Sequence, residues 1–429
     1  MKQVGIIGSY GGGSIGDEAI LKGLLSMLDE HRTAIDITVF TGNDNVTRTA
    51  LGKAGEGISF VNWSAARPKA ASVSSGGQQP RSLIKQTFLA VKKASPTVAA
   101  YADEARRRAK KMKRISPKLF NGLDVLIFGG GNVLMDIYPT WVFFLQEVLA
   151  EAKNAGVPVV FLGVGAGPLK SAAAKHTMKK IVSTCFVSVR DQGSADVIEK
   201  VTGVAPVVHA DLALGLFREH EPLVRKSENL HIGVTVVPYY ADFYWPTHSP
   251  EIYKAYTTNM GAVLDAVLVK HSQAKVTFFA TNYPADEQVA RQVQATMKTK
   301  DAVAVNSTHM SVEALLDTTS EFDLVLGTRL HSLILSLCAG TNVVAANYQP
   351  KVNYFIERIN KPADYLSMKK LSQPLTPDQI EAMADHILAI AKEGTKTFHE
   401  ARVQLKYERQ QLEDTLTRIL ADEKVASQL

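Results

Sequence analysis

The sequence predicts an α/β protein with two Rossmann-like domains whose parallel sheets face a cleft. Short apolar runs alternate with helical patterns along nearly the whole chain, and this alternation is typical of parallel sheets with right-handed crossovers. A polar and charged stretch at 217–230 divides the series into two sets. The chain has 429 residues, 46% of them hydrophobic, which is enough for two separate cores.

Each set of apolar runs defines one predicted domain. We expect an N-terminal domain over 1–216, a linker over 217–230, a C-terminal domain over 231–375, and a helical tail over 376–429. The tail either caps the second domain or crosses back to the first. The predicted strands are 2–8, 37–41, 124–130, 157–165, 185–190 and 205–211 in the first domain, and 231–237, 275–281, 302–306, 323–327 and 342–347 in the second.

A strongly basic segment interrupts the first domain. Residues 64–118 hold 14 Lys and Arg against two acidic residues, a local charge of +12 in a chain whose net charge is +6. The segment has few large apolar residues, which predicts an insertion that is part flexible and part basic helix. It is either a solvated loop or a contact for anionic lipids. We expect no nucleic-acid role, because aromatic residues are not interleaved with the basic ones.

Several classes of protein are disfavoured by composition. Only two cysteines occur, so we expect no disulfide framework. No apolar run approaches the roughly 20 residues of a membrane span. We expect no signal peptide, because the first residues lack a long enough apolar stretch for one. These features predict a soluble, cytoplasmic protein. No HExxH or CxxC spacing is present, so we expect no metal.

Basic side chains follow two apolar runs of the second domain. Arg329 and His331 come directly after 323–327, and Lys351 follows 342–347. Ligands of parallel sheets bind beyond the carboxyl ends of the strands, so this set predicts a site for a small dianion or trianion. His331 could also donate a proton, because the unperturbed pKa of histidine is near 6.5. The alternative is a histidine that caps the helix and an arginine paired with Asp323 or Glu321.

Arg190 and Asp211 end two predicted strands of the first domain, and we expect both to bind substrate in the same cleft. An arginine at a strand end is a good fork for phosphate or carboxylate. Arg190 could instead pair with Asp191. Asp191 itself is predicted to start a helix.

Two glycine-rich loops complete the candidate site. "GSYGGGSIGDEAIL" (8–21) lets a phosphate or sugar approach Gly12 and Gly13 and the following helix N-terminus, although it is no P-loop. Asp17 in that helix either contacts a ligand or only caps the helix.

"FGGGNVLMD" (128–136) is the second glycine-rich loop, and it offers Gly130 and Asn132 to a substrate. Asn132 and Asp136 could hydrogen-bond the hydroxyls of a sugar. The alternative is a tight turn with polar caps.

These motifs together resemble the polysaccharide pyruvyl transferases. The resemblance rests on the two glycine loops, on "GVGAGPL", "VRDQGSADV" and "HADLALGL", and above all on "GTRLHSLILSLCAGTNVVAANYQPKV" (327–352). It covers nearly the whole chain except the basic insertion and the tail. It implies a fold similar to the two-domain GT-B glycosyltransferases.

The resemblance also implies a reaction. Members of this family transfer the enolpyruvyl group of phosphoenolpyruvate to a sugar and form a pyruvate ketal. Arg190, Arg329, His331 and Lys351 would then bind the phosphate and carboxylate of the donor. His331 is the expected acid, and Asp17 is the candidate base or a residue that orients the sugar hydroxyl. No cofactor is implied.

The acceptor implied by the resemblance is a sugar, which in this family can be linked to a lipid diphosphate at the cytoplasmic membrane face. The basic segment 64–118 would then offer a peripheral membrane contact. Two other classes of function remain open. One is a nucleotide-sugar glycosyltransferase on the same fold, and the other is a non-catalytic sensor of phosphoenolpyruvate or a glycan.

Overall fold

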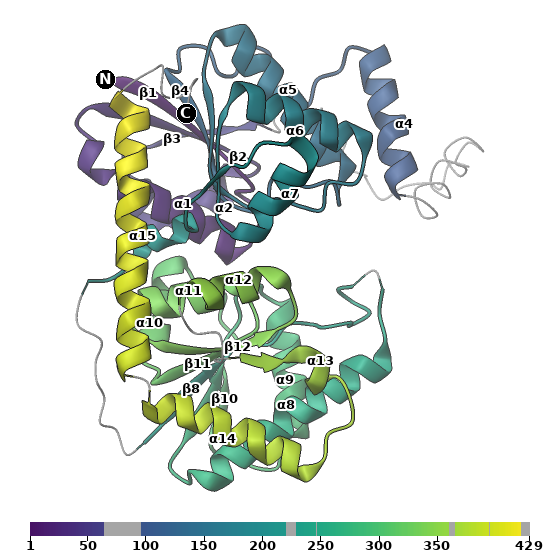
Figure 1. The fold of residues 1–429 in the computed structure, drawn as a ribbon, viewed down its shortest axis with the longest axis vertical. Coiled ribbons are helices and arrows are strands. Elements are labelled where there is room, and N and C mark those ends of the chain that lie inside the picture. The colour runs from purple at the N-terminus through teal and green to yellow at the C-terminus, as the bar shows by residue number, and fades with distance from the viewer. Residues whose placement is uncertain (64–95, 220–228, 246, 360–364, 394, 422–429) are drawn as a thin grey trace, which may run out of the picture.

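A computed structural model describes residues 1–63, 96–219, 229–245, 247–359, 365–393 and 395–421. Within these residues the chain forms two parallel sheets, each flanked by helices, so the predicted α/β class with two Rossmann-like units is confirmed. Figure 1 shows the two units one above the other, with helix α15 running along both.

The first sheet has seven parallel strands in the order β3-β2-β1-β4-β5-β6-β7. Chain order reverses between β1 and β4, so the loops after these two strands flank the switch point where ligands of such sheets bind. The strands are β1 (Lys2–Ile7), β2 (Ile35–Thr41), β3 (Ser59–Asn62), β4 (Val125–Gly129), β5 (Val159–Val164), β6 (Phe186–Val189) and β7 (Val207–Val208).

Helices cover both faces of this sheet, which explains why β4 and β5 are apolar and buried at every position. The helices are α1 (Ile15–Met27), α2 (Asp44–Leu51), α4 (Pro96–Ala109), α5 (Pro139–Ala155), α6 (Ala172–Thr184) and α7 (Gln192–Thr202), with the 3₁₀ turns η1 (Asp29–His31), η2 (Gly52–Gly55) and η4 (Leu212–Leu216).

The second sheet has six parallel strands in the order β10-β9-β8-β11-β12-β13. Its switch point lies between β8 and β11, so the residues that follow β11 stand at the ligand-binding position of this sheet. The strands are β8 (His231–Val234), β9 (Lys275–Phe278), β10 (Val303–Val305), β11 (Leu324–Gly327), β12 (Asn342–Asn347) and β13 (Tyr365–Ser367).

The helices of the second unit place its functional residues at helix starts. They are α8 (Pro250–Lys270), α9 (Ala285–Thr296), α10 (Val312–Ser320), α11 (Leu330–Cys338), α12 (Pro350–Arg358) and α13 (Met368–Leu371). Arg329 is the N-cap residue of α11, and Lys351 lies in the first turn of α12.

Two helices form the C-terminal region. One packs on the second unit and the other crosses back to the first, so both arrangements that the sequence left open occur. Helix α14 (Pro377–Glu393) packs on α8 of the second unit. Helix α15 (Thr395–Ala421) crosses back to the first unit, where the Leu420 carbonyl accepts a hydrogen bond from Lys2 Nζ at 3.0 Å. The helix therefore ties the two units together along one side of the molecule (Figure 1).

The core also joins the two units. One buried cluster contains side chains of α1, η4, α11 and α15, including Leu21, Leu212, Leu333 and Leu405, all 0% exposed. Burial of these apolar side chains stabilises the contact between the two units, by about 25 cal/mol for each Å² of apolar surface removed from water. The two units are therefore in direct contact where α1 and η4 of the first unit meet α11 of the second.

Sequence patterns missed two strands, β3 and β13, which lie at sheet edges and are only four and three residues long. Short edge strands give little periodic signal. Of the basic segment 64–118, residues 64–95 lie outside the described residues. The domain boundaries predicted from the sequence stay predictions, although all described strands fall within 1–216 and 231–375.

Candidate active site

The first glycine loop folds onto the second. Tyr10 Oη donates to the Gly129 carbonyl at 2.5 Å, and the Gly11 N–H donates to Glu18 Oε1 at 2.8 Å. Gly11 and Gly13 have φ values of 79° and 80°, a backbone region that favours glycine. These contacts fix the start of α1 at the edge of the cleft.

His331 reaches across the cleft to the start of α1. A Cβ atom at Gly16 would overlap the Nδ1 atom of the His331 ring, so the imidazole lies directly against the α1 backbone. On its other side, His331 Nε2 lies 3.6 Å from Asp211 Oδ2 in the first unit. The predicted acid therefore comes from the second unit but is surrounded by residues of the first.

Arg190 and Asp211 form a buried ion pair at 2.9 Å, from Nη1 to Oδ2. The Asp211 carboxylate also accepts from the Ala213 N–H at 3.0 Å. Burial opposes ionisation, but the contacts with His331 and Arg190 hold the pKa of Asp211 well below its usual range. Asp211 is therefore a fixed negative charge that orients both basic groups.

Asp191, the alternative partner of Arg190, lies farther from the guanidinium than Asp211 does. Arg190 Nε lies 3.6 Å from Asp191, and Asp191 mainly caps α7 by accepting from the Ser194 N–H at 2.7 Å. Among the described residues, Arg190 Nε has no hydrogen-bond partner although it is buried. The guanidinium thus keeps a donor for a ligand.

Asp17 is electrostatically linked to the same group. Burial raises the pKa of the Asp17 carboxyl, while His331 and Arg190 lower it and Asp211 raises it. A carboxylate with a raised pKa is a better proton acceptor. Asp17 can serve the helix start and also contact a ligand. Its carboxyl lies among the charged groups His331, Arg190 and Asp211.

Lys351 belongs to this group as well. Burial and, to a lesser extent, the charges of Arg190 and Arg329 together lower the pKa of its ammonium to about 8, although Asp17 and Asp211 oppose them. Lys351 and Arg190 line one small recess together with Tyr354 and Arg358. A buried lysine whose pKa is lowered by two neighbouring arginines marks a place where an anion would be favoured.

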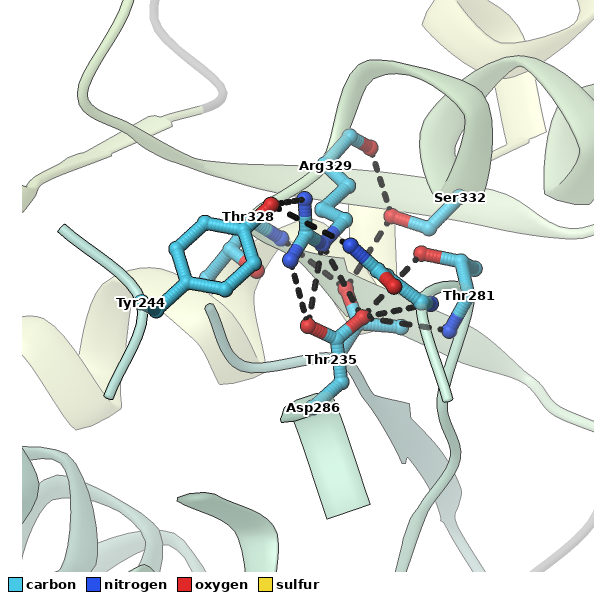
Figure 2. A network of polar contacts seen from close by, with 8 residues as sticks. Thr235, Tyr244, Thr281, Asp286, Thr328, Arg329 and Ser332 are labelled. Atoms are coloured by element: carbon cyan, nitrogen blue, oxygen red, sulfur yellow. Dashed lines mark hydrogen bonds and ion pairs between the residues drawn. The ribbon is translucent and has the colours of Figure 1, made fainter. Parts of the chain in front are cut away.

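Arg329 is held differently (Figure 2). Its Nε and Nη2 atoms meet both carboxylate oxygens of Asp286 at 2.6–3.0 Å, and Nη1 lies 3.4 Å from Tyr244 Oη. The partner of Arg329 is therefore an acid of α9, whereas Asp323 accepts from the His231 N–H. Figure 2 shows Asp286 also anchored by the loop that carries Thr281.

The predicted glycines have different surroundings. Gly13 lines a cavity between the units, and Gly12 is exposed at its edge of the loop. Gly130 has a packing reason, because a Cβ there would lie 2.5 Å from Ile20 and its φ is 64°. Substrate contact for all three stays a prediction.

Asn132 lies beside Arg190. A Cβ at Gly165 would be 2.8 Å from Asn132 Oδ1 and 3.1 Å from Arg190 Nη2, so both side chains pass over this glycine. Asp136, by contrast, accepts from the N–H groups of Lys170 and Ser171 at 2.7 and 2.5 Å, which is a structural cap at the start of α6.

Two acids at the cleft were not recognised from the sequence. Asp286 could have been suspected from its place in the first turn of a helix that follows a strand, since carboxylates there often have a structural or binding role. Glu18 stands beside Asp17 in the first turn of α1, where an acid usually serves the helix start, yet it is buried and one of its oxygens lacks a partner among the described residues.

No group of three or more His, Cys, Asp or Glu that could hold a metal ion occurs among the described residues. No described helix is long and apolar enough to cross a bilayer. What the cleft does present is a set of cations, an imidazole and two carboxylates, drawn from both units. Such a set can bind a small polyanion and exchange protons with it.

Comparison with known proteins assigns the class. The family model described as polysaccharide pyruvyl transferase matches residues 15–350, which is most of the chain. The chain belongs to this family. It is therefore a transferase of polysaccharide pyruvylation, and the resemblance drawn from the motifs is confirmed. No curated protein sequence matches the chain significantly.

Solved structures show the GT-B-like fold at low sequence identity. A putative UDP-N-acetylglucosamine 2-epimerase from Listeria monocytogenes has a TM-score of 0.52 and 10% identity, over 97% of this chain and 94% of that one. The S. aureus MnaA–UDP co-structure has a TM-score of 0.52 and 9% identity, over 98% and 97%. Identities this low show a shared fold and nothing about the ligand.

Proposed function

We propose that the protein transfers the enolpyruvyl group of phosphoenolpyruvate to a sugar of a cell-surface polysaccharide or its precursor. The observation that carries this proposal is the convergence of Arg190, Lys351 and His331, from both units, beside the carboxylates Asp17 and Asp211. Family membership supports pyruvyl transfer in general, and this cluster suits the particular donor.

The donor carries a phosphate and a carboxylate, so it needs cations on more than one side. Arg190 has a buried donor to spare, and Lys351 stands in the first turn of α12, where free backbone N–H groups and the helix dipole also favour an anion. The start of α11 at Leu330 offers a second such terminus. In this arrangement no cofactor or metal is needed to neutralise the leaving phosphate.

The proposed chemistry begins with a proton. Protonated His331 gives its proton to the methylene carbon of phosphoenolpyruvate, and an oxocarbenium-like centre forms at the adjacent carbon. One sugar hydroxyl adds there and loses its proton to Asp17. A second hydroxyl then attacks the same carbon while the bond from this carbon to the phosphate oxygen breaks. The ketal closes, and the proton of the second hydroxyl leaves with the inorganic phosphate.

The first experiment measures phosphate release from phosphoenolpyruvate in the presence of free and lipid-linked hexoses and N-acetylhexosamines. We expect release that depends on the acceptor in the wild type. In His331→Ala we expect kcat to fall by about 10²–10⁴, the usual contribution of a general acid. His176→Ala, which changes an exposed histidine of α6, is the matched control and should keep full activity.

Other outcomes would separate the alternatives. Activity that survives in His331→Ala keeps the reaction but assigns the acid to another group. A rise in melting temperature with phosphoenolpyruvate, without turnover on any acceptor, would favour a sensor. Stabilisation by UDP or GDP instead of phosphoenolpyruvate would favour a nucleotide-sugar glycosyltransferase.

We also propose that the reaction takes place at the cytoplasmic face of a membrane, with the basic segment in contact with anionic lipids. In the described part of this segment, Arg107, Arg108 and Arg114 form ion pairs with acids of α4 and α5. The exposed charges of Arg106, Lys110 and Lys111 would supply the attraction, at about 1 kcal/mol each.

Flotation with vesicles that contain phosphatidylserine tests this contact. Reversal of these three charges to glutamate should reduce the bound fraction strongly. The control reverses three exposed lysines of the second unit, Lys254, Lys298 and Lys300, and should bind as the wild type does. Equal binding by both variants would rule out the described part of the segment as the contact.

A further inference from the structure

A cavity of about 400 Å³ opens between the two units, beside the first turn of α1. Its size falls in the range of about 300–1,000 Å³ that is common for small-molecule sites. Three segments form its walls: the glycine loop with α1, the helix α2, and the residues that precede α10 in the second unit. Its lining includes Gly13, Glu18, Asn45, Thr49, His309 and Met310.

The cavity contains a buried acceptor that needs a partner. Glu18 is 2% exposed, and its Oε1 atom accepts from the Gly11 N–H at 2.8 Å. Among the described residues, Oε2 has no hydrogen-bond partner. An unsatisfied buried oxygen is costly, and a ligand that donates a hydrogen bond to it would remove this cost.

The pKa of this carboxyl agrees with the geometry. Burial and the charge of Asp17 together raise the pKa of Glu18 to about 7, although the hydrogen bond from Gly11 opposes them. Tyr10, whose hydroxyl is bonded to Gly129, and His309 on the opposite wall are titratable groups nearby. One turn further along α1, Lys22 forms an ion pair with Glu313 of α10.

The walls suit a neutral sugar. Of the described residues that line the cavity, none is lysine or arginine, so a diphosphate or phosphorylated ligand would find no counter-charge there. Ile15, Val46 and Met310 offer apolar surface, which packs on the C–H face of a pyranose ring. Asn45 and Thr49 offer hydrogen bonds to its hydroxyls.

The cavity lies next to the anion cluster but on another side of α1. Consecutive residues of a helix point about 100° apart, so Asp17 faces His331 and Arg190 while Glu18 faces the cavity. A Cβ at Gly13 would meet nothing within 4 Å, so the loop leaves open space on this side. The cavity and the anion cluster are therefore joined by adjacent residues of one helical turn, Glu18 and Asp17.

We infer that this cavity is the acceptor subsite, which binds the pyranose ring, and that Glu18 Oε2 accepts a hydrogen bond from one sugar hydroxyl and so orients the ring. Glu18 takes part in no bond making or breaking. The inference rests on the proposed pyruvyl transfer, because it assigns the second substrate of that reaction to a place.

Two variants test the cavity, and both leave the anion cluster unchanged. Thr49→Trp fills the cavity from an exposed position of α2, and Lys53→Trp places the same side chain at an exposed position outside the lining. Glu18→Gln keeps an oxygen for Gly11 but replaces the unpartnered one. Each variant is assayed for its KM for methyl glycosides of hexoses and N-acetylhexosamines, and for stabilisation by phosphoenolpyruvate.

We expect Thr49→Trp to raise the KM for the acceptor by at least about tenfold, since a filled pocket excludes the ring. Glu18→Gln should raise it by about tenfold, as loss of a charged hydrogen bond does. Phosphoenolpyruvate should still raise the melting temperature of both variants as it does that of the wild type. Lys53→Trp should match the wild type throughout.

An acceptor KM that is equal in Thr49→Trp and Lys53→Trp, with active wild type, overturns the inference alone. Loss of the phosphoenolpyruvate effect in Thr49→Trp also overturns it, because the cavity would then belong to the donor. A wild type without turnover on any acceptor contradicts the proposed function. In that case saturation-transfer NMR of the same glycosides tests the cavity alone, and equal signals from wild type and Thr49→Trp reject it.

Discussion

In each sheet of this molecule one strand is followed by an arginine that pairs with a buried aspartate, but the two pairs differ in what they leave for a ligand. Arg190 of the first sheet bonds Asp211 through one nitrogen, and its buried Nε has no hydrogen-bond partner among the described residues. Arg329 of the second sheet has two nitrogens on Asp286 and the third near Tyr244.

The difference shows that position at a strand end does not by itself make an arginine a ligand. Asp286 is 1% exposed and is also bonded by the backbone N–H groups of Thr281 and Asn282, so the pair with Arg329 is complete without an anion. Arg190 keeps an Nε–H group that can donate a hydrogen bond to an anion, and its charge acts in the same group as His331 and Lys351. We therefore expect Arg190 to bind the donor and Arg329 mainly to hold the second unit's end of the cleft in shape.

The largest effect should come from breaking the complete pair. Asp286→Ala leaves Arg329 charged and largely buried without its partner, and such a change typically lowers the free energy of unfolding by about 3–5 kcal/mol. Denaturant unfolding measures it. The control is Asp317→Ala, which breaks an exposed pair with Arg218 and should cost at most about 1 kcal/mol. Equal losses in the two variants would show that Asp286 is no structural anchor.

Next in size is the effect on donor binding. Arg190→Gln removes a charged donor from the anion site, and the loss of such hydrogen bonds, about 1.5–3 kcal/mol, should raise the KM for phosphoenolpyruvate by about 10- to 150-fold. Arg329→Gln should raise it much less and should mainly lower the melting temperature. If Arg329→Gln instead weakens phosphoenolpyruvate binding as strongly as Arg190→Gln, the proposed difference between the two arginines is wrong.

The contrast also explains what the sequence could reveal. Arg190, Arg329 and Lys351 could be placed from the sequence because each follows an apolar run, and such runs in a parallel sheet end at the same edge. The partners could not be placed in this way. Asp286 precedes Arg329 by 43 residues, and the two meet only because β9 and β11 flank β8, an order that periodicity does not reveal.

The sequence also could not predict which face of α1 turns toward the second unit. Asp17 and Glu18 are adjacent acids in one helical turn, and nothing in the local pattern says which of them faces the other unit. The structure places Asp17 toward His331 and Glu18 toward the cavity beside α2. That rotation is set by the packing of α1 on η4 and α10, which depends on tertiary contacts.

A smaller effect should follow from displacing the His331 imidazole, which lies between the ends of the two sheets. Gly16→Ala places a methyl group where the His331 ring now lies, so the imidazole must shift while both arginines stay in place. We expect kcat to fall by about tenfold, in line with the cost of small misplacements in an active site. Gly55→Ala meets Phe60 only at 3.5 Å and serves as the control. An unchanged kcat in Gly16→Ala would argue against His331 as the acid.

The smallest expected effect is a pH dependence of donor binding that comes from Lys351, whose pKa is lowered by both arginines. Burial and the charges of Arg190 and Arg329 lower the pKa of Lys351 to about 8, although Asp17 and Asp211 oppose them. The charged form, which binds the anion, is therefore present below pH 8 and is lost as the pH rises above it.

The affinity for phosphoenolpyruvate should then fall above pH 8, by at most about tenfold per pH unit for one proton. Calorimetric titration between pH 7 and 9.5 measures this fall. Lys351→Arg stays charged over that range, so its affinity should change little with pH even if it is weaker throughout. Parallel pH profiles for the two proteins would mean that Lys351 does not carry the donor's counter-charge, and would leave Arg190 as the main cation of the site.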